Sequence, residues 1–275
     1  MRCSSTSTIE RLAEALEEGL RRELRLTPKP GLVDLEDCGS HPDLTLDSME
    51  RSITLVRGYL DRIAESLVSG QPLAEQVAIG REAEARMLSE QRSNTHKGAV
   101  FLGGLMLVAL HRAESRGDQV LRRTVQIVAG ELLANGAPLA THGAAARRLF
   151  GVGGILKEAL EGLPSIFDGA LPAFRSARQQ GWDLPTASFS ALARLMRVVE
   201  DTTALHRCGQ AGLDRLRQDG LRLEQLLEQR GDHQAFLREC NSVYRKMNLT
   251  MGGVADLLGV SLGWLVYRGE IPAAK

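Results

Sequence analysis

Residues 99–110 read Ala-Val-Phe-Leu-Gly-Gly-Leu-Met-Leu-Val-Ala-Leu and form the longest apolar run in the chain. A helix that spans a membrane needs about 20 such residues, so this shorter run is typical of a helix buried in a protein core. The sequence therefore predicts a central apolar helix from Ala99 to about Ala113, with the rest of the fold packed around it.

A helical period continues on both sides of this run. The apolar residues of the first segment recur at intervals of three and four, which places them on one face of a helix: Ile9, Leu12, Leu16, Leu20 and Leu24. No period-2 run of β-branched residues indicates a strand. The sequence thus predicts an all-α fold in a single catalytic domain over 1–275. Further helices are expected at about 49–67, 72–90, 118–134, 141–150, 153–161, 186–206, 208–219, 222–230, 233–247 and 251–267. Prolines leave the pattern from Pro164 to Gly181 unassigned.

The composition restricts the class of protein. A chain of 275 residues can bury roughly 70–75% of its unfolded surface, so it needs no disulfide or structural metal. Lys plus Arg equals Asp plus Glu at 34 each, which leaves no net field to attract nucleic acid or a membrane. The four cysteines lie far apart, as expected for reduced thiols rather than a zinc site. The N-terminus lacks the apolar segment of a secretory signal, so we expect a cytoplasmic protein.

A polar turn precedes the apolar helix directly, because residues 94–98 read Asn-Thr-His-Lys-Gly. Backbone N–H groups at a helix start are unpaired and carry partial positive charge, which favours an anion such as phosphate. Lys97 adds a full positive charge, and Asn94 and His96 add hydrogen-bond donors. The alternative is a capped helix with a solvated lysine. The glycine spacing of a Walker A loop is missing.

A long loop over 27–43 carries a second group of polar residues. Its two prolines exclude a helix interior. A loop of this length in a compact helical protein is more often functional than not. Its candidate site residues are Lys29, Asp34, His41 and Asp43, although either aspartate could instead cap a helix.

Glu84 lies on the inward face of its predicted helix, in register with Val77, Gly80, Met87 and Leu88. A buried carboxylate needs a cation or a hydrogen-bond donor as its partner. The residue is therefore a candidate for the site, with a plain ion pair to an arginine as the alternative.

Three later stretches add candidates: His142 in the turn 141–143, Asp201 with Arg207, and Asp256 after a glycine pair. Asp256 could instead be an aspartate that interacts with a helix dipole. Carboxylates with Lys and His suit Mg²⁺ bound to substrate phosphates, since Mg²⁺ prefers few carboxylates plus substrate oxygens. The residues alone predict an anion-binding enzyme that uses a divalent metal.

In this order, the motifs resemble those of the triphosphoribosyl-dephospho-CoA synthase family. The resemblance covers most of the chain and rests on Thr27-Pro-Lys-Pro-Gly-Leu-Val-Asp34, Gly39-Ser-His-Pro-Asp43, Gly80-x-x-Ala-Glu84, Asn94-Thr-His-Lys-Gly-Ala99, Thr141-His-Gly143, Gly162-Leu-Pro164, Asp201-Thr202 with His206-Arg207, and Gly252-Gly253 with Ala255-Asp-Leu-Leu258. The chain departs from the family pattern at Thr203, where asparagine is usual, and at Thr45, where aspartate is expected. It also has Thr250-Met-Gly-Gly-Val254 in place of Ser-Pro-Gly-Gly-Ser, and Gly151-Val-Gly-Gly-Ile in place of a Gly-Ala-Arg-like turn.

The resemblance implies a transferase that moves the 5-triphosphoribosyl group of ATP to the 2′-hydroxyl of 3′-dephospho-CoA and releases adenine. The product would be the prosthetic-group precursor for the acyl carrier protein of citrate lyase or malonate decarboxylase. The transferase that loads this carrier is then an expected partner. Breaking the N-glycosidic bond builds positive charge at C1′, which a carboxylate stabilises. A base must also take the hydroxyl proton.

The resemblance also suggests residue roles. Asp34, Glu84 and Asp201 are the predicted ligands of Mg²⁺, and Asp34 or Glu84 could also stabilise the charge at C1′. Asp43 or His41 is the predicted base. The predicted contacts to the bound nucleotides come from Lys29, Asn94, His96, Lys97, His142, Arg207 and Asp256.

Two other functions fit the same residues. One is an all-α, Mg²⁺-dependent hydrolase of a nucleotide or an ADP-ribosyl group. The other is a non-catalytic helical protein that binds CoA or a carrier domain. Adenine released without an acceptor would indicate the hydrolase, and no adenine at all would indicate the binding protein.

Overall fold

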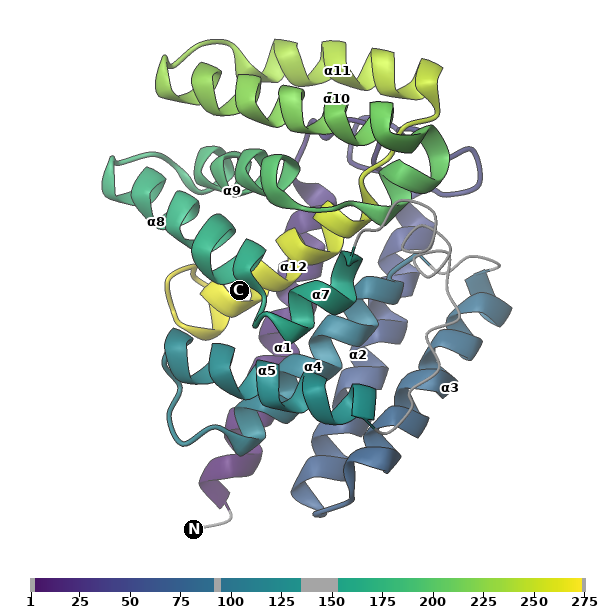
Figure 1. Cartoon of the computed structure of the whole chain (residues 1–275), viewed down its shortest axis with the longest axis vertical. Helices are drawn as coiled ribbons and strands as arrows, with labels where there is room; N and C mark the ends of the chain where they lie inside the picture. Colours follow the sequence, from purple (N-terminus) through teal and green to yellow (C-terminus); the bar gives the residue numbers. More distant parts are fainter. Residues whose placement is uncertain (1–2, 92–94, 135–152, 274–275) are drawn as a thin grey trace.

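The computed structural model describes residues 3–91, 95–134 and 153–273, and these residues form helices without a β-strand. The predicted all-α fold is confirmed, while the helix expected at 141–150 lies outside the described residues. In chain order the helices are α1 (Cys3–Arg25), α2 (Leu46–Val68), α3 (Leu73–Gln91), α4 (Lys97–Arg112), α5 (Asp118–Ala134), α7 (Gly154–Leu160), the π-helix η1 (Ser165–Ala170), α8 (Leu171–Gln179), α9 (Leu184–Val198), α10 (Thr202–Glu228), α11 (His233–Met247) and α12 (Gly252–Tyr267) (Figure 1).

The apolar run forms the buried helix that the sequence predicts. Every residue of α4 from Leu102 to Leu110 is buried. The helix contacts α1, α2, α3, α5 and α12, and Figure 1 shows it with α2 and α3 on one side and α5 on the other. In the described part of the chain, no helix has both the length and the apolar character to cross a membrane.

Helices α1 and α12 make the most extensive helix–helix contact in the fold. The apolar residues that recur along α1, from Ile9 to Leu24, are all buried. At the crossing the two backbones touch, because a Cβ added at Gly19 would collide with the backbones of Gly259 and Gly263. Glycine at these positions therefore sets how closely the two helices pack.

Replacing Gly19 by alanine is expected to lower the free energy of unfolding by about 2 kcal/mol, because overpacking a close contact costs about 1–3 kcal/mol. Gly58→Ala in α2 is the matched control, since an added Cβ there meets no atom within 4 Å. That variant should gain up to about 1 kcal/mol, because alanine is the better helix former. Urea unfolding followed by circular dichroism measures both, and equal stability of the two variants would contradict the role given to Gly19.

The structure corrects two predicted helix ends. The helix expected at 186–206 ends at Val198, because the Asp201 side chain caps a new helix that begins at Thr202. The break expected near Gly220 is wrong, because α10 is kinked at the non-helical Gly209 instead and then continues to Glu228. Gly220 serves close packing against α9 instead, since an added Cβ would lie 2.7 Å from Met196 Cβ.

The stretch from Pro164 to Gly181, which the pattern leaves unassigned, contains η1 and α8. Pro164 precedes η1 and Pro172 lies in the first turn of α8, where the missing N–H of proline costs no intrahelical bond. Buried apolar side chains from Ile9 to Ile271 form one cluster that includes this stretch.

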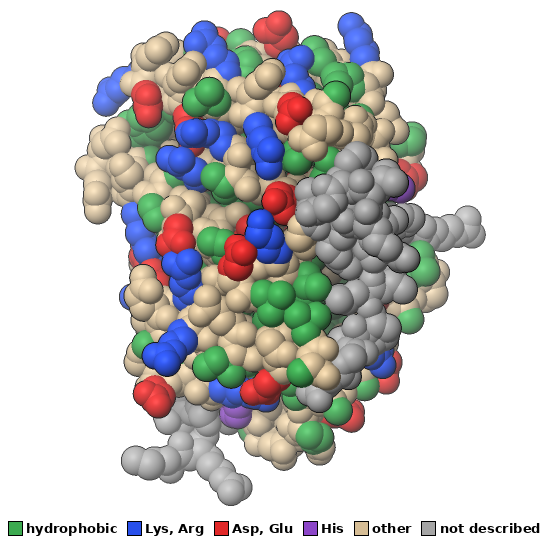
Figure 2. Space-filling view, viewed as in Figure 1, with side chains coloured by type: hydrophobic (Ala, Val, Ile, Leu, Met, Phe, Trp, Pro, Cys, Tyr) green, Lys and Arg blue, Asp and Glu red, His purple; other side chains and the backbone are tan. Residues whose placement is uncertain are grey.

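Charged side chains of both signs are interspersed on the face of the molecule that Figure 2 shows. This mixture agrees with the net charge of zero. Attraction of anionic ligands on this face therefore depends on local groups rather than on a field of one sign.

Candidate functional site

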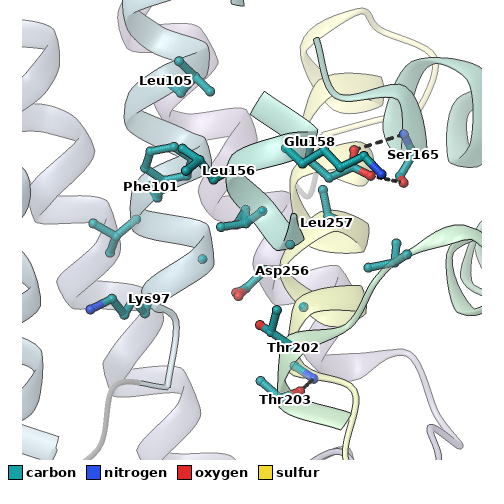
Figure 3. Close-up of a pocket in the computed structure, with 18 of the residues that line it drawn as sticks. Lys97, Phe101, Leu105, Leu156, Glu158, Ser165, Thr202, Thr203, Asp256 and Leu257 are labelled. Carbon is teal, nitrogen blue, oxygen red and sulfur yellow. Dashed lines mark hydrogen bonds between the residues drawn. The ribbon is translucent and has the colours of Figure 1, made fainter. Parts of the chain in front are cut away.

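A cavity of about 1410 Å³ is lined by residues from α2, α3, α4, α5, α7, α10 and α12. Pockets for one small ligand usually measure about 300–1,000 Å³, so this cavity has room for more than one. In Figure 3, Lys97, Phe101 and Leu105 lie along α4, and Leu156 of α7 and Asp256 of α12 face them. The cavity is polar near Lys97 and apolar towards Leu105.

The polar end of the cavity lies at the start of four helices. The first turns of α4, α7, α10 and α12 contribute the lining residues Lys97, Gly98, Gly154, Thr202, Thr203, Gly252 and Gly253. Helix N-termini carry partial positive charge and favour anions. Most of these first-turn amides are already paired with Asp256, Asp201, Thr203 and Glu200, so the positive charge that a ligand can reach here comes mainly from side chains such as Lys97.

Asp256 caps the start of α4 from another helix. Its carboxylate accepts hydrogen bonds from the backbone N–H groups of Gly98 and Ala99. A Cβ at position 98 would collide with this carboxylate, so only glycine fits there. Burial, reinforced by the charges of Glu23 and Asp201, raises the pKa of Asp256 well above its usual range. From the sequence, the amides at the start of α4 are expected to bind an anionic ligand. The N–H groups of Gly98 and Ala99 are instead paired with Asp256.

Asp201 joins the starts of α10 and α12 and is fully buried. Its Oδ1 accepts the N–H groups of Thr203 and Ala204 at 2.8 and 3.0 Å, and its Oδ2 accepts that of Val254 at 2.9 Å. The Thr203 hydroxyl donates to the same carboxylate and accepts the Gly252 N–H at 2.8 Å. Threonine therefore supplies both a donor and an acceptor where the family pattern has asparagine. The glycine pair at 252–253 serves this close packing.

Lys97 and Glu84 form an ion pair at the cavity, with 2.6 Å between Nζ and Oε2. Each side chain is about one third exposed, at 34% and 32%, so a ligand can reach both. Met87 is buried as predicted, but Leu88 is exposed, so the inward face of α3 is narrower than the register indicated. Burial and the charge of Glu84 raise the pKa of Tyr59, another residue of the cavity wall.

His41 and Arg207 line another part of the wall. Arg207 Nη2 donates to His41 Nδ1 at 3.2 Å, and Thr250 Oγ1 donates to Gly31 O at 2.9 Å. Because Nδ1 accepts a hydrogen bond and the Thr250 hydroxyl proton is already used, the ring proton of His41 lies on Nε2. Nε2 therefore donates to Thr250 Oγ1 at 2.8 Å. Burial and the Arg207 charge lower the pKa of His41 to about 4. At neutral pH the ring is therefore uncharged, and it orients Arg207.

Lys29 and Asp34 lie behind the cavity wall rather than on it. Lys29 is 1% exposed, and its Nζ donates to Glu23 Oε1 at 2.6 Å. Asp34 accepts the N–H groups of Lys29, Glu36 and Asp37 at 2.7, 2.8 and 3.2 Å. Both side chains therefore fix the conformation of the 27–43 loop.

His96 is also buried behind the wall, where Ser52 Oγ lies 2.7 Å from its Nδ1. Its Nε2 has no hydrogen-bond partner within the described part of the chain. Burial and the charge of Lys29 lower the pKa of His96 to about 4. The imidazole is therefore held in its neutral form.

This low pKa predicts a loss of stability in acid. An unfolded chain has a histidine pKa of about 6.5, so below that pH it binds a proton that the folded protein does not. The free energy of unfolding should fall by up to about 3 kcal/mol as the pH drops to about 4. In His96→Gln this component should be missing. Urea unfolding at neutral pH and near pH 4 measures the difference, and an identical pH dependence in both proteins would contradict it.

The structure brings part of the predicted site together. The predicted residues that line the cavity are His41, Asp43, Glu84, Lys97, Asp201, Arg207 and Asp256. Lys29, Asp34 and His96 are not part of the lining, and Asn94 and His142 lie outside the described residues. Of the two predicted bases, Asp43 is exposed and His41 has both ring nitrogens engaged. Asp43 is therefore the more accessible base.

The predicted metal ligands do not converge. Asp34 and Asp201 each accept three backbone N–H groups, and Glu84 pairs with Lys97. Within the ranges that the structure describes, no group of three or more His, Cys, Asp or Glu side chains is placed to hold a metal ion. These residues therefore do not fit a preformed metal site.

Four carboxylates of the cavity lining were not predicted from the sequence, namely Glu158, Glu161, Asp168 and Glu200. Glu200 accepts the N–H of Gly153 at 2.9 Å, at the start of α7. Glu158 accepts hydrogen bonds from the N–H and hydroxyl of Ser165, and burial raises its pKa. The glycine pair at 153–154 was the available signal for Glu200, since a helix start needs acceptors for its amides. Glu158 stands in no motif.

The family model and the related proteins that match this chain all belong to one transferase family. A family model for ATP:dephospho-CoA triphosphoribosyl transferase matches residues 9–271. The probable 2-(5''-triphosphoribosyl)-3'-dephosphocoenzyme-A synthase of Azotobacter vinelandii is 35% identical over 93% of this chain and 91% of its own. A probable synthase of the same name from Pseudomonas putida is 33% identical, covering 93% and 94% of the two chains. The 2-(5''-triphosphoribosyl)-3'-dephosphocoenzyme-A synthase of Klebsiella pneumoniae is 32% identical, covering 92% and 89%. No solved structure matches this chain.

Proposed function

The chain belongs to the ATP:dephospho-CoA triphosphoribosyl transferase family, and we propose that the large cavity is its active site, with the triphosphate of ATP at the polar end. The protein is a transferase that joins the triphosphoribosyl group of ATP to dephospho-CoA. One observation carries the proposal. Lys97 and Arg207 supply positive charge to one cavity that is large enough for two nucleotides.

The chemistry of this transfer balances without a further reactant. The bond between C1′ of ATP and its adenine breaks, and the 2′-oxygen of dephospho-CoA bonds to C1′. The hydroxyl loses a proton and the departing adenine gains one. Positive charge develops at C1′ during the exchange, so carboxylates around the ribose stabilise it.

Three carboxylates of the cavity take separate roles in this proposal. Asp43 is exposed and accepts the proton of the 2′-hydroxyl. Glu84 stabilises the positive charge at C1′ and holds Lys97 towards the phosphates. Asp256 donates a proton to adenine, because its raised pKa favours the protonated carboxyl.

Mg²⁺ belongs to this proposal only as part of the ATP that enters. The roles given to Asp43 and Asp256 do not involve it, and the predicted ligands Asp34, Glu84 and Asp201 do not meet. Mg²⁺ commonly binds through substrate phosphates with one or two carboxylates, and such an ion needs no preformed cage. The family resemblance further supports a product destined for the acyl carrier protein of citrate lyase or malonate decarboxylase, passed on by the transferase that loads it.

The function is tested by incubating the protein with ATP, Mg²⁺ and dephospho-CoA and following free adenine. Adenine should appear only when both nucleotides are present, together with the coupled product. Adenine without dephospho-CoA would identify a hydrolase. No adenine under any condition would identify a binding protein.

Lys97→Ala should lower kcat/KM for ATP by about 10- to 100-fold, because a hydrogen bond to a charged group contributes about 1.5–3 kcal/mol. Arg86→Ala is the matched control, since Arg86 is an exposed cation of α3 paired with Glu90 and lies outside the cavity lining. Steady-state kinetics with varied ATP measures both variants. If the two behave alike, Lys97 does not contact the triphosphate.

A further inference from the structure

One face of α4 continues from the polar end of the cavity into its apolar end. Phe101, Leu105 and Val108 follow Lys97 at helical spacing, and all four line the cavity. At 1.5 Å per residue, the face from Lys97 to Val108 is about 16 Å long. Figure 3 shows Lys97, Phe101 and Leu105 in this row. The cavity thus contains a long apolar passage that starts beside a cation.

Apolar side chains of neighbouring helices complete this passage. Val77 of α3, Leu132 of α5 and Leu156 of α7 line the same cavity. We call the part lined by Phe101, Leu105, Val108, Val77, Leu132 and Leu156 the apolar channel. The triphosphate of ATP would not bind along this surface, because burying charge among apolar groups costs free energy.

We infer that the apolar channel binds the pantetheine arm of dephospho-CoA, an inference that rests on the proposed function. The arm is the only long and uncharged part of either substrate. Stretched out, it has the length of about four residues of extended chain, or roughly 14 Å, which matches the channel. A purine ring is shorter than the channel and would leave much of it unfilled.

The order of groups in dephospho-CoA agrees with the order of residues along α4. The arm is attached to the diphosphate, so an arm in the channel leads the diphosphate to the polar end of the cavity, next to the triphosphate of ATP. The 2′-hydroxyl then lies at the polar end, among Asp256, Thr202 and the other helix starts. One extended substrate can therefore occupy the channel while it presents its hydroxyl to ATP.

The two amides of the arm need partners inside an apolar channel. Glu158 and Ser165 line the cavity next to Leu156, and Figure 3 shows their side chains bonded to each other beside it. The Glu158 carboxyl can accept an amide N–H of the arm. This contact gives a reason for a half-buried carboxyl that the transfer chemistry itself does not use.

The test is a comparison of the two substrates in one steady-state assay of adenine release. Phe101→Ala should raise KM for dephospho-CoA about tenfold and leave KM for ATP unchanged. Leu156→Ala should act in the same direction, and both side chains are only half-buried, so neither truncation empties the fully buried core. Ile127→Ala is the matched control, because Ile127 is 53% exposed on α5 and lies outside the lining. Equal rises of both KM values in Phe101→Ala and Leu156→Ala would overturn the assignment.

Phosphopantetheine, which is the arm without the nucleotide, provides a direct probe. It should inhibit competitively against dephospho-CoA and not against ATP, and about tenfold more weakly in Phe101→Ala. Competition against ATP alone would overturn the assignment. Calorimetric titration of wild type and Phe101→Ala with phosphopantetheine needs no turnover. If wild type releases no adenine, the proposed transferase function fails, and this titration still decides whether the channel takes the arm.

Discussion

Asp201→Ala should lower the free energy of unfolding by about 3–4 kcal/mol. Loss of a helix cap costs about 0.5–2 kcal/mol, and here the same carboxylate also accepts the buried N–H of Val254. A buried donor left without an acceptor adds about 1–3 kcal/mol. Because the carboxylate holds two helix starts of the cavity, transferase activity should disappear as well.

Asp232→Ala is the matched control for this prediction. Asp232 also caps a helix, since it accepts the Ala235 N–H at 2.9 Å at the start of α11, but it is exposed and serves one helix. The free energy of unfolding of Asp232→Ala should fall by about 1 kcal/mol, and the variant should keep its transferase activity. Asp201→Asn should fall between the two, because its amide NH₂ cannot accept the Val254 N–H. Urea unfolding decides, and similar losses for Asp201→Ala and Asp232→Ala would show that bridging α10 and α12 adds nothing.

Asp256→Asn should reduce kcat by about 100-fold or more while the fold persists. A general acid contributes about 10²–10⁴ to a rate. Asparagine retains an oxygen that can accept the N–H groups of Gly98 and Ala99, but it cannot deliver a proton to adenine. The raised pKa of Asp256 favours the protonated form that can deliver this proton. In wild type, kcat should therefore fall as the pH rises through this pKa, and the variant should lack that fall.

A substrate with a better leaving group separates this chemical role from a structural one. An ATP analogue with an N7-methylated purine carries a positive charge on the base, so the base leaves without protonation. Asp256→Asn should turn over this analogue at nearly the wild-type rate. An equal loss with ATP and with the analogue would show that Asp256 only caps α4.

The helical architecture follows from the sequence pattern. The apolar run became α4, and the residues spaced by three and four along α1 are buried, because a helix face is defined by neighbours within the same segment. The end of α9 was missed because the cap of the next helix, Asp201, looked like one more polar residue in a continuing period. Gly220 looked like a break, but its role is to let α9 approach.

The residue types of the site could also be predicted from the sequence, whereas their positions relative to the cavity could not. Motifs indicated the residue types of a nucleotide transferase, and seven candidates do reach one cavity: His41, Asp43, Glu84, Lys97, Asp201, Arg207 and Asp256. Lys29, Asp34 and His96 belong to the same motifs but are buried with partners of their own. Nothing in the local sequence distinguishes these two groups, because both are polar residues in loops and helix starts.

By itself, the sequence determined that this protein is all-helical, that residues 99–110 lie in its core, and that it belongs to a family of triphosphoribosyl transferases. Only the tertiary structure decided which charged groups meet. Lys97 pairs with Glu84, Lys29 with Glu23, and Asp256 with the start of α4. The reason is physical, since periodicity depends on residues three or four apart, whereas the charge state of a side chain depends on burial and on partners from distant segments.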